Sequence, residues 1–282
     1  MTNAEESGPS GMSAQAPLQE PGQGRLNTPL ATSRKLLLPV LAVLVVGVIW
    51  QLLVVQLNVA EYILPPPSKF LSTLGSSWGI LWSEMVVTLQ EVLYGFVIAT
   101  VVSIPLGFLL ATVYSVRETF YPLVIFFQVI PKIAVAPLFV VWFGVGKFSV
   151  TILTFTLCFF PIVVNSMTGF MELEPRLLYL TRSMGATRWQ TFRYVRMQAA
   201  LPFIFSGLKV AIVFATTGAI VGEFVGSNAG LGYLLDRATG FLDTRLVFAD
   251  LVVLSAMGIA LSYVIEAVQW ALMPWRRGRR TR

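Results

Sequence analysis

The sequence predicts an all-α membrane protein that crosses the bilayer several times. Apolar residues make up 56% of the 282-residue chain and charged residues only 12%, about half the charged fraction of a typical soluble domain. Mean hydropathy is +0.75. Several apolar stretches approach or exceed the roughly 20 residues that a helix needs to cross a bilayer. The short alternating segments of a membrane β-barrel are absent from the sequence.

About six apolar stretches form the predicted transmembrane helices. They are residues 36–55, 85–113, 120–143, 148–171, 203–222 and 246–273. Pro122, Pro131 and Pro137 lie in the third stretch, and prolines remove helical hydrogen bonds, so this span must be kinked or interrupted.

The remaining segments divide into tails and connections. Residues 1–33 have no apolar periodicity and read as a disordered cytoplasmic tail, without the features of a cleavable signal peptide. A permease domain follows at 34–275, and a basic cytoplasmic tail at 276–282. One amphipathic helix in the outer interface is predicted after the triple proline from its apolar spacing. Its apolar positions are Leu71, Leu74, Trp78, Leu81 and Trp82. The outer connection 223–245 is rich in glycine and reads as a loop.

Basic residues give the orientation. Of 20 Lys and Arg residues, 14 fall in segments that the six-span arrangement places in the cytoplasm, and four (Lys69, Lys147, Arg237 and Arg245) fall outside. The positive-inside rule therefore predicts that both termini are cytoplasmic. The net charge of +6 follows this topology, so no nucleic-acid partner is predicted.

Composition also excludes several chemistries. The chain has no histidine and a single cysteine, Cys158, within an apolar stretch. A disulfide within the chain, a His/Cys metal site and a His-based catalytic triad are therefore impossible, and the sequence predicts neither a metal site nor catalytic residues.

The most informative segment is 174–202, which carries five arginines and no acid between Arg176 and Arg196. Pro175 suits the first position of a helix, and Gly185 suits its C-terminal stop. Thr187 and Gln190 have the spacing of a capping box that starts a second helix. A structured, cationic, cytoplasmic helical hairpin predicts a docking surface for a soluble partner.

This hairpin resembles the cytoplasmic signature of binding-protein-dependent ABC importer permeases, Glu-Ala-Ala, three residues, Gly, nine residues, Ile, one residue, Leu-Pro. Gly185 matches the glycine and Val195 takes the isoleucine position. The chain departs from the signature at Glu-Ala-Ala, which is Tyr179-Leu180-Thr181, and at Leu-Pro, which is Met197-Gln198.

Other segments are similar to the branch that includes nitrate, taurine and alkanesulfonate permeases. They are 63–68, 130–131, 136–138, 142–144, 185–192, 199–202, 206–208 and 230–233. The resemblance implies a type I importer permease fold and a bacterial inner-membrane location. It also implies ATPase-coupling residues on the hairpin. These are Tyr179, Leu180, Thr181, Gly185, Ala186, Arg188, Val195 and Pro202.

The resemblance further implies partners and a solute range. Two permease copies, embedded in lipid, would pair and bind a cytoplasmic ABC ATPase dimer, and an external binding protein would deliver the solute. This chain would hold no cofactor, and ATP would bind the partner subunit. The solute would be a sulfonate, taurine or nitrate, or alternatively a thiamine-pyrimidine precursor or riboflavin.

Three charged residues in the spans or at their ends are candidates for lining the translocation path. Glu91 and Glu223 lie near the outer ends of two stripes of small residues spaced four apart, in the second and fifth spans. Such stripes let helices pack closely, so the two carboxyl groups either hold this packing together or face a wet path. Lys132 lies in the proline-broken span and either snorkels, pairs with a carboxylate or attracts an anionic solute.

Two other classes of protein fit less well. An ion-coupled secondary transporter would not need the arginine-rich hairpin. An intramembrane enzyme would need convergent catalytic groups, and no such motif occurs in this sequence.

Overall fold

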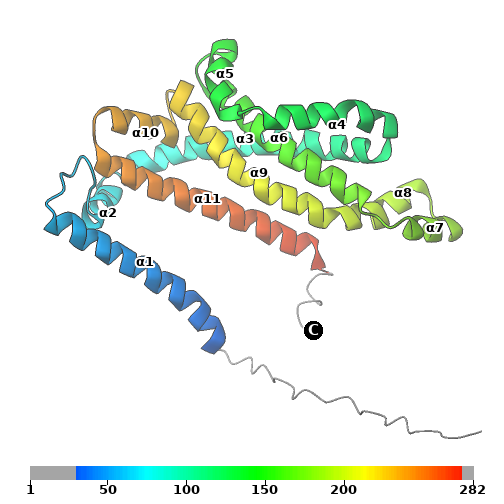
Figure 1. Cartoon of the computed structure of the whole chain (residues 1–282), viewed down its shortest axis with the longest axis horizontal. Coiled ribbons are helices and arrows are strands. Elements are labelled where there is room, and N and C mark those ends of the chain that lie inside the picture. The colour runs from blue at the N-terminus through cyan, green and yellow to red at the C-terminus, as the bar shows by residue number, and fades with distance from the viewer. Residues whose placement is uncertain (1–29, 275–282) are drawn as a thin grey trace, which may run out of the picture. The chain divides into compact units, whose positions relative to one another are not determined.

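The computed structural model describes residues 30–274, and the regular structure in this range is helical (Figure 1). The helices are α1 (Leu30–Gln56), α2 (Pro67–Ser76), α3 (Trp78–Thr112), α4 (Tyr114–Val129), the 3₁₀ turn η1 (Lys132–Val135), α5 (Ala136–Phe143), α6 (Lys147–Met171), α7 (Pro175–Ser183), α8 (Arg188–Thr191), the π-helical turn η2 (Phe192–Arg196), α9 (Met197–Gly226), α10 (Leu231–Gly240) and α11 (Thr244–Leu272). The predicted tails lie outside the described residues, except for 30–33, which belong to α1.

The chain divides into two units, Met1–Val48 and Ile49–Arg282. In the first unit the described part is the beginning of α1. The second unit holds the remainder of α1 and all other helices, and the packing described below lies within it.

Most of the predicted spans are confirmed. Among the described residues, four helical stretches are long and apolar enough to cross a membrane, namely α3, α6, Arg188–Gly226 and α11. Tyr114–Val129 and Lys132–Phe143 form a fifth, broken by a bend of 80°, which confirms the interruption predicted from the prolines. The first predicted span coincides with α1, whose segment Leu41–Gln56 is a shorter apolar helix.

Two predictions for the outer segments are wrong. The single interfacial helix is in fact two helices, because α2 ends at Ser76 and α3 begins at Trp78. Two consecutive serines at this point are weak helix formers, which favours the break. The connection 223–245 also contains a helix, α10, which its glycines obscured in the sequence.

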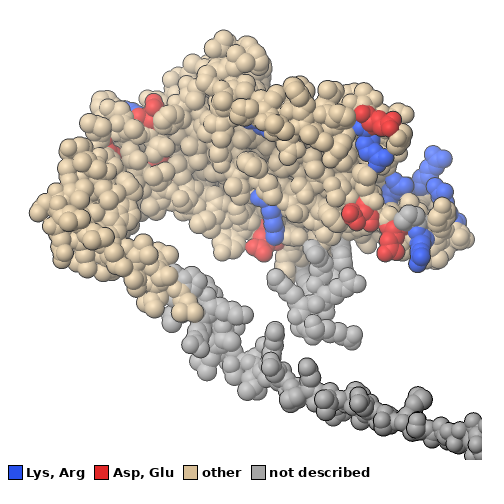
Figure 2. Space-filling view, in the orientation of Figure 1, with Lys and Arg blue, Asp and Glu red and all other residues tan. Residues whose placement is uncertain are grey.

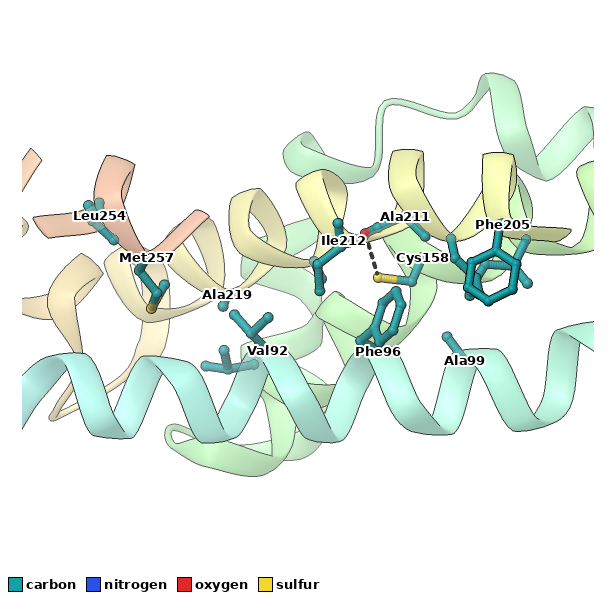
Figure 3. Close-up of a cluster of buried hydrophobic side chains, with 14 of the residues drawn as sticks. Val92, Phe96, Ala99, Cys158, Phe205, Ala211, Ile212, Ala219, Leu254 and Met257 are labelled. Carbon is teal, nitrogen blue, oxygen red and sulfur yellow. Dashed lines mark hydrogen bonds between the residues drawn. The ribbon is translucent and has the colours of Figure 1, made fainter. Parts of the chain in front are cut away.

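The core forms around α6, which packs most extensively on α3 and α9. Figure 3 shows the side chains that fill this region and reach α11, among them Phe96, Ala211 and Met257. Cys158 of α6 is fully buried here and its Sγ donates to the carbonyl oxygen of Ala211 at 3.3 Å. The lone cysteine is therefore a packing residue.

The two small-residue stripes are close-packing surfaces, as predicted, and both face α6. A Cβ atom added to Gly95 of α3 would lie 2.6 Å from Cβ of Thr154, and one added to Gly207 of α9 would lie 2.8 Å from Cβ of Asn165. Backbones can approach this closely only where side chains are small. The stripes therefore hold α3 and α9 against the same central helix.

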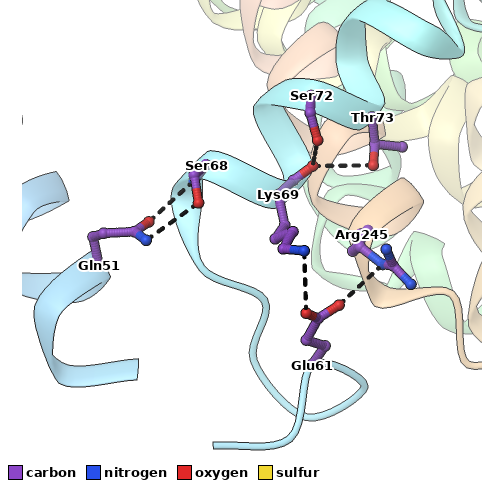
Figure 4. Close-up of polar contacts among 7 residues, drawn as sticks. All are labelled: Gln51, Glu61, Ser68, Lys69, Ser72, Thr73 and Arg245. Atoms are coloured by element: carbon purple, nitrogen blue, oxygen red, sulfur yellow. Dashed lines mark hydrogen bonds and ion pairs between the residues drawn. The ribbon is translucent and has the colours of Figure 1, made fainter. Parts of the chain in front are cut away.

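Polar contacts join several segments at the end of the molecule that is predicted to lie outside (Figure 4). Glu61 pairs with Lys69 of α2 at 3.7 Å and with Arg245 of α11 at 3.4 Å. Gln51 of α1 exchanges hydrogen bonds with Ser68 of α2 through its side-chain amide. Within the second unit, α2 and α10 lie at one end of the long helices, and α7 and α8 lie at the other (Figure 1).

Candidate functional site

The hairpin has the local structure that the sequence predicts. Helix α7 begins at Pro175. The chain turns at Gly185, whose φ of +73° lies in the left-handed region that favours glycine. Helix α8 starts with a complete capping box. The backbone N–H of Gln190 donates to Oγ1 of Thr187 at 3.2 Å, and the backbone N–H of Thr187 donates to Oε1 of Gln190 at 2.8 Å.

Large apolar side chains on the hairpin are exposed. Tyr179, Leu180 and Met184 of the first half and Trp189 of the second are each more than half exposed. Basic side chains cluster over the same end of the molecule (Figure 2). Exposed large apolar side chains that lie close together are typical of surfaces that contact another protein or the membrane.

The eight predicted coupling residues divide by exposure. Tyr179, Leu180, Gly185 and Arg188 are exposed, and the other four are half-buried. The half-buried residues Thr181 and Ala186 are joined across the turn, because the backbone N–H of Ala186 donates to the carbonyl oxygen of Thr181 at 3.0 Å. The exposed members are therefore available to a partner, and the half-buried members support the turn and its junction with α9.

An aromatic contact that sequence reasoning missed joins the hairpin to the spans. The ring of Phe192 lies 4.9 Å from that of Phe108 in α3, 6.4 Å from that of Phe170 in α6 and 5.8 Å from that of Trp189 (centroid distances). Phe192 begins the π-helical turn η2, which also contains Val195 and leads directly into α9. Phe192 therefore connects the hairpin to α3 and α6 through ring contacts, and the chain continues from it into α9.

At the opposite end, the N-terminus of α10 is held by three side chains. Backbone N–H groups of Gly230, Leu231 and Gly232 donate, respectively, to Oε2 of Glu84 at 2.6 Å, Oγ1 of Thr88 at 2.8 Å and Oε2 of Glu223 at 2.6 Å. These N–H groups have no partner within the helix, and carboxylates complement the helix dipole there. The three acceptors are called the α10 clamp below.

The α10 clamp gives Glu223 a structural role, and its neighbour Glu91 is enclosed as well. Glu91 and Glu223 are no more than 1% exposed. Both carboxyl oxygens of Glu91 lack a hydrogen-bond partner among the described residues. Asp250 of α11 is also fully buried. In this structure Glu91 and Glu223 therefore face the packed interior.

Lys132 lies where the broken third span bends. Its Nζ donates to the carbonyl oxygen of Gln128 at 2.8 Å and lies 4.7 Å from the ring centroid of Phe160. The three ion pairs found in the described part of the chain do not include Lys132. Of the three candidate path residues, it is the one that is not enclosed.

The chain belongs to the family of binding-protein-dependent transport system inner membrane components, whose family model matches residues 103–278. Members of this family are multi-pass membrane permeases, and the structure accordingly defines a permease subunit of an ABC importer. Membership implies an ATPase and a binding protein as partners.

Several characterised proteins are similar to this chain. The riboflavin transport system permease RibX of Chloroflexus aurantiacus is 38% identical, over 84% of this chain and 89% of RibX. The formylaminopyrimidine transport permease ThiX of Halalkalibacterium halodurans is 35% identical, over 85% of this chain and 96% of ThiX. The taurine transport permease TauC of Escherichia coli is 28% identical, over 88% of this chain and 92% of TauC.

A solved structure shows the same fold. A chain of the MetNI methionine ABC transporter in an inward-facing conformation matches with a TM-score of 0.53 and 22% identity. The match covers 69% of this chain and 93% of that chain. The prediction of an ABC importer permease fold is therefore confirmed.

Proposed function

We propose that this permease binds its ATPase through the hairpin 174–202 and that ATP is hydrolysed on that partner. The observation that carries the proposal is the exposed apolar and basic surface of α7 and α8, joined to three spans through Phe192. Such a surface suits a soluble protein that binds the hairpin and moves the spans joined to it. The hairpin and both termini then face the cytoplasm, as the basic residues favour.

The proposed complex contains a second copy of this permease, two ATPase subunits and an external binding protein, within the lipid bilayer. The end that carries α2 and α10 would receive the binding protein. ATP-driven closure of the ATPases would move the hairpins and open the path outward.

Trp189→Ser is expected to lower ATPase recovery at least fivefold when the permease is purified in mild detergent, because exposed tryptophans dominate many protein interfaces. Trp142→Ser is the matched control, since Trp142 is also exposed but belongs to α5, away from the hairpin. The measurement is the ATPase-to-permease ratio on a stained gel. Equal ratios for wild type and Trp189→Ser would contradict the dock.

For the solute we propose a small nitrogen heterocycle of the riboflavin or aminopyrimidine kind. The support is the order of identity, which is 38% to RibX and 35% to ThiX but 28% to TauC. All three solutes lie within the range that the sequence implied.

A sulfonate is the second candidate, and Lys132 favours it. Its ammonium group lies at a break in a membrane span and has no carboxylate partner among the described residues. Irregular backbone at this depth is tolerated mainly where it faces protein or water. An uncompensated cation beside a wet path would attract an anionic solute.

Lys132→Gln keeps much of the side-chain length and removes the charge. If the solute is a sulfonate, taurine uptake should fall about tenfold while assembly and basal ATPase activity stay unchanged. Lys147→Gln is the control, because Lys147 donates to Gln90 at 3.4 Å at the start of α6. Full taurine uptake by the Lys132 variant would show that its charge does not serve the solute.

A further inference from the structure

A groove of about 670 Å³ runs between α9 and α11, with Leu235 of α10 at its outer end. This volume is within the range of small-molecule sites. Along α9 it extends from Ile220 to Lys209, which is about 16 Å at 1.5 Å per residue. It therefore follows the spans lengthwise over roughly half of the hydrocarbon core.

The walls of this groove are mainly apolar, with polar groups set among the apolar side chains. Four serine and threonine hydroxyl groups line it, from Thr216 and Thr217 of α9 and from Ser255 and Ser262 of α11, together with the phenol of Tyr263. At the inner end Lys209 and Glu266 face each other at 3.9 Å. Polar side chains within spans usually face a bundle interior or a water-filled cavity.

The protons of the four serine and threonine hydroxyl groups are already engaged. Each hydroxyl donates to the backbone carbonyl four residues earlier in its own helix, at distances between 2.7 and 3.1 Å. This is the usual arrangement for serine and threonine in membrane helices. A hydroxyl oxygen whose proton is engaged still has a lone pair to offer. These four oxygens therefore form a row of hydrogen-bond acceptors between apolar side chains.

We propose that this groove is the solute-binding section of the translocation path and that it selects flat heterocycles bearing N–H or O–H donors. Apolar walls would cover the ring faces, and the hydroxyl oxygens would accept from amino, imide or hydroxyl groups at the rim. Taurine has no flat ring for the apolar walls to cover, and its sulfonate group, which only accepts hydrogen bonds, gains little from the serine and threonine oxygens. This inference rests on the proposed permease function and names the substrate class of its path.

Ser255→Phe tests whether the solute binds in the groove, because the larger side chain would fill it. Uptake of riboflavin and formylaminopyrimidine should fall at least tenfold in cells that express the whole transporter. Ala256→Phe is the control, because Ala256 is exposed on the adjacent position of α11 and does not line the groove. It should leave uptake unchanged, and both variants should retain the ATPase on purification.

The double variant Thr217→Val with Ser255→Ala tests the chemistry, because it removes two acceptors with little change of shape. Loss of two neutral hydrogen bonds should raise the KM for heterocycle uptake by about 5- to 150-fold. The maximal rate should stay near that of the wild type, which a merely structural role would not predict.

The outcomes separate the groove from the permease function. Normal heterocycle uptake by Ser255→Phe would overturn the groove and leave the proposed solute class intact, and a bound lipid chain would then be the better occupant. Lost uptake together with lost assembly would identify an interface with the second copy. Wild-type cells that take up taurine alone, or none of the three probes, would overturn the heterocycle class and the groove's selectivity together.

Discussion

Gly230→Val is expected to destabilise the outer end of the permease severely. Gly230 has a φ of +108°, and a Cβ atom there would overlap the carboxyl group of Glu223. Valine in this backbone conformation costs about 1–3 kcal/mol. Displacing Glu223 would also break its hydrogen bond to Gly232, worth about 0.5–1.5 kcal/mol. The melting temperature of the purified protein should fall by roughly 10 °C.

Gly240→Val is the matched control for this change. Gly240 ends the same helix, and nothing lies within 4 Å of a Cβ atom added there. This variant should melt within about 2 °C of the wild type, since substitutions in open space change stability little. The melt can be followed by tryptophan fluorescence in detergent. A Gly230→Val protein that melts with the wild type would show that the α10 clamp adds no stability.

The sequence predicted the spans well because the membrane imposes a simple rule. A helix in lipid must satisfy its own backbone and present apolar side chains, so length and hydropathy locate it without knowledge of its neighbours. The proline-broken third span was predictable for the same reason. The boundary between α2 and α3 was not predictable, because the apolar residues on the two sides of Ser77 keep the spacing of a single helix.

The α10 clamp shows where such reasoning stops. Glu84, Thr88 and Glu223 are separated from one another by up to 139 positions in the chain, and they converge only because α3 and α9 pack on the same helix. Helix α10 itself was hidden by Gly230 and Gly232, whose presence is explained by the close approach of Glu223. A local sequence pattern cannot identify a contact partner that lies so far away in the chain.

The hairpin was predictable in its turn and its cap, since both depend on neighbours within four residues. Its link to the spans was not, because Phe192 reaches Phe108 across a long separation in sequence. The π-helical turn that holds Phe192 also leaves no simple pattern. The Gly185 turn lies between the two halves of the proposed dock, and Phe192 joins that dock to the spans. A change at Gly185 should therefore affect transport strongly.

Gly185→Val is expected to abolish most uptake while the protein still inserts and folds. The φ of Gly185 is +73°, and nothing lies within 4 Å of a Cβ atom added there. Steric overlap therefore plays no part, and the cost of about 1–3 kcal/mol comes from the backbone conformation alone. The turn would relax by moving α7 relative to α8. The exposed side chains that we assign to the dock would then no longer form one surface.

Gly75→Val is the control, because Gly75 in α2 also has open space around it but no positive φ. Stimulation of ATPase activity by solute-loaded binding protein should fall at least tenfold in Gly185→Val and remain within about twofold of wild type in Gly75→Val. Gly185→Ala should lie between them, since alanine shares the φ penalty but lacks the β-branch that makes valine a stronger outlier. A Gly185→Val transporter that retains both its ATPase and full stimulation would exclude the turn from coupling. The basic C-terminal residues would then be the next candidate for binding the ATPase.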